Sequence, residues 1–106
     1  MKRDEVERRL LDVHARLVRA RQELAVAEEQ LDVFLETADE ARLRALVSET
    51  PLADRDWQDA QRHAEAMIRG RDNASARVAE LERAQDELLA KLVVRTAIGH
   101  TRGVSQ

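Results

Sequence analysis

The 106-residue sequence has no cysteine and no tyrosine, only one proline, and three glycines. Without cysteine there is no disulfide framework, so we expect a reducing compartment such as the cytoplasm. The scarcity of proline and glycine leaves few of the turn signals that a β-rich fold needs. The chain has no run of about 20 apolar residues, the length that crosses a bilayer. Residues 2–9 are all charged except Val6, so we expect neither a secretory signal nor a membrane partner.

Side chains that carry out catalysis or bind metals are also scarce. The three histidines (His14, His63 and His100) are far apart in the sequence, and no serine is predicted to lie near any of them. A structural metal site needs three or four converging ligands. Asp59 and His63, four residues apart, are interpreted as an ordinary pair on a helix surface. We therefore expect no enzymatic activity, no catalytic residue, no metal and no cofactor.

The residues that are present favour long helices. Charged residues make up 37% of the chain, and alanine, glutamate, arginine and leucine dominate, as is typical of coiled coils. Apolar side chains recur with alternating spacings of four and three in two segments. The first segment is Val6, Leu10, Val13, Leu17, Ala20, Leu24, Ala27, Leu31, Phe34, Ala38, Ala41 and Ala45. The second is Trp57, Ala60, Ala64, Met67, Arg71, Ala74, Val78, Leu81, Gln85, Leu88 and Leu92.

These two heptad patterns are mirror images about Glu49. Pairing residues whose numbers add up to 98 places Trp57 opposite Ala41 and Ala64 opposite Phe34, a large side chain against a small one. The same pairing sets Glu36 opposite Arg62, and we expect such pairs to form ion pairs between the helices. The pattern predicts an all-α fold, an antiparallel two-helix coiled-coil hairpin in a single register.

The expected boundaries are a helix over about 3–47, a turn at 48–50, a second helix over about 51–95 and a flexible tail over 96–106. Thr50 suits a helix N-cap, and Pro51 suits the first helical position. Two sites leave alternatives open. A capping box at Thr37 would start a separate short helix, although the unbroken heptad favours a continuous one. Gly70 would split the second helix, although the apolar pattern resumes without a shift at Ala74.

A second set of apolar residues lies beside the two heptad patterns and widens the apolar face. A lone hairpin of this length is only marginally stable, so we expect these residues to form an interface. The simplest arrangement is a homodimer of hairpins, a four-helix bundle, although a helical partner protein would fill the groove equally well. The predicted interface residues are Leu11, Val18, Ala25, Leu35, Ile68, Leu89 and Val93.

Four polar residues on or beside the second heptad pattern have two interpretations. Arg71 and Gln85 interrupt the apolar seam, and we expect them to fix its register, with Arg71 reaching past Ala27 toward carboxylates on the first helix. In the second interpretation, the residues from Arg69 to Asp72 form an Arg-x-x-Asp motif, which resembles motifs that some proteins use to bind cyclic dinucleotides.

Charge is unevenly distributed, although the net charge is only −3. Residues 1–21 carry seven basic side chains, whereas residues 22–41 carry seven acidic ones and no basic one. The net charge makes nucleic-acid binding a weak expectation. The segregation nevertheless favours, as an alternative to self-association, a transcription regulator that binds a sigma factor, RNA polymerase or DNA.

With the segment Ser48 to Ala53 joining two charged amphipathic helices, the chain resembles small coiled-coil hairpin proteins of actinobacteria. Sixteen arginines against two lysines fit the high G+C content of such genomes. Some hairpins of that lineage act as anti-sigma factors that respond to cyclic di-GMP, but their ligand-binding string is not found in this sequence. The chain also resembles the coiled-coil arm of transcript-cleavage factors, which carries acidic residues at its tip. The corresponding acidic residues in this sequence would be Glu49, Asp54 and Asp56.

Overall fold

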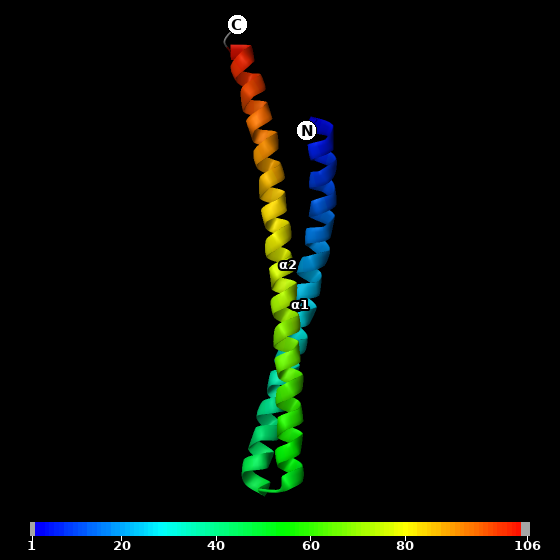
Figure 1. Ribbon diagram of the computed structural model, residues 1–106, viewed down its shortest axis with the longest axis vertical. Helices are drawn as coiled ribbons and strands as arrows, with labels where there is room; N and C mark the ends of the chain where they lie inside the picture. Colours follow the sequence, from blue (N-terminus) through cyan, green and yellow to red (C-terminus); the bar gives the residue numbers. More distant parts are fainter. Residues whose placement is uncertain (1, 105–106) are drawn as a thin grey trace. The chain divides into compact units, whose positions relative to one another are not determined.

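The computed structural model describes the backbone of residues 2–104 and the side chains of residues 2–93. Two long helices, α1 (Arg3–Ser48) and α2 (Pro51–Val104), account for nearly all of it (Figure 1). No strand occurs in the described part of the chain. The prediction of an all-helical protein with two long helices packed against each other is therefore confirmed.

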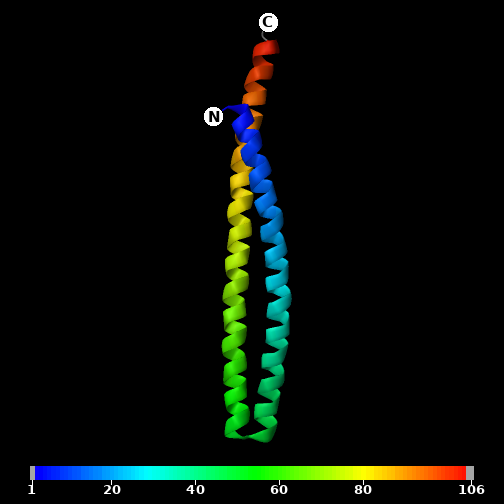
Figure 2. The same ribbon diagram turned by 90° about the vertical axis from the view of Figure 1, so that its right-hand side faces the viewer.

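The chain divides into two compact units. The turn unit is Gln22–Ala76, and the terminal unit combines Met1–Arg21 with Arg77–Gln106. In each unit a stretch of α1 lies beside a stretch of α2 that runs in the opposite direction (Figures 1 and 2). Each unit therefore contains its own part of the contact between the helices.

The packed seam is the one that the heptad spacing predicts. On α1, the side chains that are not exposed are the twelve members of the first heptad pattern and no others. On α2, all eleven members of the second pattern are buried or half-buried. The fully buried apolar residues belong to these two patterns: Val6, Leu17, Ala20, Leu31, Ala41, Ala45, Ala64, Val78 and Leu88. The seam is thus confirmed residue by residue, because a heptad repeat keeps one stripe of each helix facing the other.

Contacts between the helices also test the register. In the turn unit, the rings of Phe34 and His63 lie 6.1 Å apart in an edge-on arrangement. His63 is adjacent in sequence to Ala64, the predicted partner of Phe34, so the register is correct here to within one residue. The predicted ion pair between Glu36 and Arg62 is wrong, because Arg62 pairs with Asp59 on its own helix. A partner three residues away on the same helix needs less side-chain ordering than one on the opposite helix.

Both helices are continuous at Thr37 and at Gly70, as the unbroken apolar pattern favoured, and α2 is longer than expected. The Thr37 hydroxyl donates a hydrogen bond of 3.0 Å to the Val33 carbonyl, so Thr37 lies within a continuous α1 instead of capping a new helix. Gly70 lies inside α2, with open space around it. The predicted end of the second helix near residue 95 is wrong, since α2 continues to Val104. Beyond Pro51 the chain has no proline to stop a helix, and isolated glycines only weaken one. Residues 105–106 of the predicted tail lie outside the described residues.

The turn between the helices is very short. Glu49 has a φ of 50°, in the left-handed region, and its amide donates to the Ala45 carbonyl at 3.1 Å. This bond closes the C-terminus of α1 in the αL capping geometry. The Thr50 hydroxyl accepts a hydrogen bond of 3.2 Å from the Ala53 amide, which confirms Thr50 as the N-cap of α2.

Replacing Glu49 with glycine should stabilise the protein. In the left-handed region, a residue with a Cβ is strained by about 1–2 kcal/mol, and glycine avoids this strain. Glycine also makes the unfolded chain more flexible, which destabilises the folded state by about 0.5–1 kcal/mol. We expect a net gain of about 0.5 kcal/mol in the free energy of unfolding, measured by urea denaturation. Glu49→Ala is the matched control, because it removes the same charge and keeps the Cβ. An equal gain in both variants would show that charge, and not backbone conformation, is responsible.

Candidate interaction surfaces

The predicted interface residues are accessible on the surface. Five of them are large aliphatic residues whose exposed fraction ranges from 41% for Val18 to 72% for Leu11. Ala25 is also exposed, and Ile68 is half-buried. Their exposure leaves them free to contact a partner, whose existence stays a prediction.

In the terminal unit, an ion pair marks the side on which these residues lie. The side chains of Arg21 (α1) and Glu82 (α2) approach to 3.6 Å and bridge the helices. Val18 precedes Arg21 by three residues, and Leu89 follows Glu82 by seven, spacings that place them on the same side of their helices as the bridge. Leu11, one heptad before Val18, and Val93, four residues after Leu89, continue the two rows. These four apolar residues therefore share one side of the terminal unit.

In the turn unit, the predicted residues Leu35 and Ile68 line the same groove. This side groove has a volume of about 310 Å³. Its lining consists of Leu35, Ala38, Asp39, Arg42, Trp57, Gln61, Ala64, Glu65 and Ile68. Trp57 is only half-buried, so the largest side chain of the seam also forms part of the groove. The sequence assigned Trp57 to the seam alone, because spacing indicates which way a side chain faces but not how far the opposite helix covers it.

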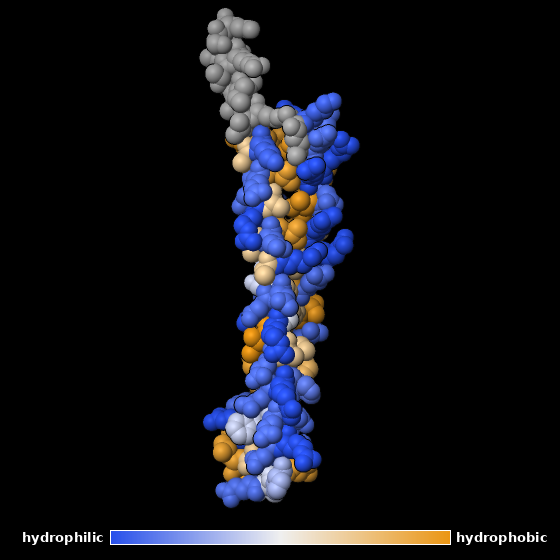
Figure 3. Space-filling model, in the orientation of Figure 1, coloured by the Kyte–Doolittle hydropathy of each residue, from blue (hydrophilic) through white to orange (hydrophobic). Residues whose placement is uncertain are grey.

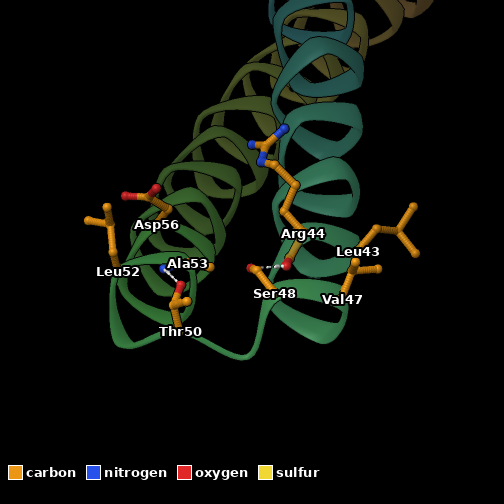
Figure 4. Close-up of a pocket in the computed structure, with 8 residues that line it drawn as sticks. All are labelled: Leu43, Arg44, Val47, Ser48, Thr50, Leu52, Ala53 and Asp56. Carbon is orange, nitrogen blue, oxygen red and sulfur yellow. Dashed lines mark hydrogen bonds between the residues drawn. The ribbon is translucent and has the colours of Figure 1, made fainter.

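A second hollow lies at the turn, and sequence reasoning missed it. The tip hollow has a volume of about 420 Å³ and is lined by Leu43, Arg44, Val47, Ser48, Thr50, Leu52, Ala53 and Asp56. Figure 4 shows Leu43 and Val47 on the α1 edge and Leu52 on the α2 edge, with the cap residues between them. Apolar surface is also visible at this end of the turn unit in Figure 3. The available signal was a cluster of four large aliphatic residues outside the heptad pattern, Leu43, Leu46, Val47 and Leu52, within ten positions of the sequence.

The four predicted register or ligand residues lie apart from both hollows. The Arg71 Nε donates to Asp72 Oδ1 at 2.9 Å, so the expectation that Arg71 reaches carboxylates on the first helix is wrong. Its side chain is 38% exposed, and the carboxylate with which it pairs belongs to the next residue of the same helix. Gln85 is half-buried in the seam, and Arg69 is exposed. None of the four lines the side groove or the tip hollow.

The described side chains provide no cluster of three or more histidine, aspartate or glutamate residues that could hold a metal ion. Asp59 pairs with Arg62, and His63 packs against Phe34. Within the described residues, neither helix contains a stretch apolar enough to cross a membrane.

The chain matches no family model, no curated protein and no solved structure.

Proposed function

We propose that the chain is a coiled-coil interaction module that associates with a second copy of itself through the apolar side surface and performs no reaction. The side surface has one patch in each unit: Leu11, Val18, Leu89 and Val93 in the terminal unit, and Ala25, Leu35 and Ile68 in the turn unit. Two hairpins joined in this way would form a four-helix bundle with two-fold symmetry. The observation that carries the proposal is that large aliphatic side chains remain exposed beside a seam that is already filled.

The distribution of apolar side chains between core and surface supports this function. Four of the nine fully buried apolar residues are alanines, so the seam buries little surface per residue. Eleven large hydrophobic side chains are exposed in the described part of the chain. Burying apolar surface contributes about 25 cal/mol per Å², and contiguous exposed patches commonly mark interaction sites. Association through the side surface would bury five of these eleven side chains: Leu11, Val18, Leu35, Leu89 and Val93.

Val18→Glu tests this surface. The side chain of Val18 is 41% exposed, so the change should leave the isolated hairpin folded. In the dimer it would bury a charge, and we expect the free energy of association to weaken by about 2 kcal/mol, which raises the dimer dissociation constant about thirtyfold. Sedimentation equilibrium over a range of micromolar concentrations measures this constant, and circular dichroism verifies the helix content.

Val26→Glu provides a matched control. Val26 is 51% exposed on the same helix, but it lies eight residues after Val18 and outside the side surface. It should change the dissociation constant by less than about threefold, as surface changes away from an interface usually do. A wild-type protein that remains monomeric at high micromolar concentration would refute the proposed function.

A further inference from the structure

The tip hollow differs from the side surface in position. Arg42 lines the side groove and Arg44 lines the tip hollow. Two residues of an α-helix are about 200° apart around its axis, so the two hollows open on nearly opposite sides of α1. They share no lining residue. A partner bound to the side surface would therefore leave the tip hollow uncovered.

The tip hollow has exposed aliphatic side chains contributed by both helices. Val47 is 85% exposed and Leu52 is 67% exposed, so most of each side chain is in contact with water. Leu43, on the α1 edge, is also exposed. Neither Val47 nor Leu52 belongs to the packed seam. Their positions next to the turn are thus not explained by the folding of the hairpin.

Two opposite charges flank this apolar surface. Arg44 comes from α1 and Asp56 from α2, and both line the hollow (Figure 4). Neither side chain forms an ion pair in the described part of the chain, although several of the other arginine and aspartate side chains do. The hollow therefore presents one free positive and one free negative group, on different helices.

We propose that the tip hollow is a second self-association site, at which two copies of the chain dock through Leu43, Val47 and Leu52. A two-fold axis that runs between α1 and α2 over the hollow exchanges the α1 edge with the α2 edge. Arg44 of each copy then lies opposite Asp56 of the other, and the apolar edges face each other. The surface is self-complementary in both charge and hydrophobicity. Together with the side surface, it would join dimers into larger assemblies.

Charge reversal at the two positions tests this docking. Arg44→Glu places a glutamate opposite Asp56 twice in each pair, and Asp56→Lys places a lysine opposite Arg44 twice. We expect each single variant to weaken tip association by about tenfold, because two exposed attractive pairs become repulsive. A one-to-one mixture of the two variants restores attraction at both contacts, so its association should return to within about threefold of the wild type.

The measurement is sedimentation velocity at low salt, in the wild type and in the Val18→Glu background, where the side contact is weakened. Arg55→Glu is the control, since it makes the same charge change at an exposed residue that lines neither hollow. Val47→Ser should weaken tip association without affecting the charges. Restoration by mixing in the Val18→Glu background supports tip docking even if the side surface proves unimportant.

Three outcomes overturn the proposal. One is an unchanged association constant in both single variants, and another is a mixture that associates no better than either variant alone. The third is tip association that Val47→Ser leaves intact. A loss in each variant without recovery on mixing would mean that Arg44 and Asp56 do not face each other across the contact, which contradicts the proposed two-fold arrangement.

Discussion

Leu17→Ala should cost about 3 kcal/mol in the free energy of unfolding. Leu17 is completely buried and is, with Val6, one of the two largest side chains with no exposed surface. Truncating a buried leucine to alanine removes its transfer free energy and leaves a cavity, which together cost about 2–5 kcal/mol. The seam members around Leu17 in the terminal unit are mostly large aliphatic residues that are already packed, so they cannot collapse fully into the cavity, and we expect a value within this range and not below it.

Urea denaturation monitored by circular dichroism measures this loss, and amide hydrogen exchange locates it. Exchange should accelerate first in the terminal unit, because Leu17 and its packing belong to that unit. Val33→Ala is the control: it truncates an aliphatic side chain of α1 that is 60% exposed and lines neither hollow. It should change the stability by less than about 0.5 kcal/mol. If Leu17→Ala were equally harmless, the seam would not be what stabilises this unit.

The double variant Arg71→Leu, Gln85→Leu should be more stable than the wild type, by about 2 kcal/mol. Both residues occupy half-buried seam positions, where a leucine would gain about 1 kcal/mol each from apolar burial. The only ion pair lost is that of Arg71 with Asp72, which is exposed and therefore weak. Thermal unfolding should show a higher Tm.

The two single variants serve as controls, since residues two heptads apart should contribute additively. Polar residues in a seam commonly restrict register and oligomeric state at a cost in stability. We therefore expect the double variant to form mixed oligomers in sedimentation velocity. A large destabilisation by Arg71→Leu alone would contradict the register role, because it would require a network that depends on the guanidinium group.

Of the two apolar surfaces, only the side surface could be predicted from the sequence. Spacing identified Leu11, Val18 and Leu89 as apolar residues beside the seam, and the structure leaves them exposed. The same reasoning overlooked the tip hollow. The heptad spacing describes one face of one helix, whereas this hollow is lined by residues of both helices on either side of the turn.

Local patterns determined the two helices, the packed stripe on each and the caps at the turn. The period of the apolar residues, the Thr50–Pro51 signal and the near absence of proline act over a few residues, so they can be interpreted from the sequence by itself. Tertiary structure decided which ion pairs form, as Arg62 and Arg71 show by pairing within α2. It also decided how far the opposite helix covers Trp57, and that Arg44 and Asp56 share one hollow. These features depend on distances between side chains of different turns or different helices. The sequence pattern predicts which side chains face the opposite helix, but it does not predict those distances.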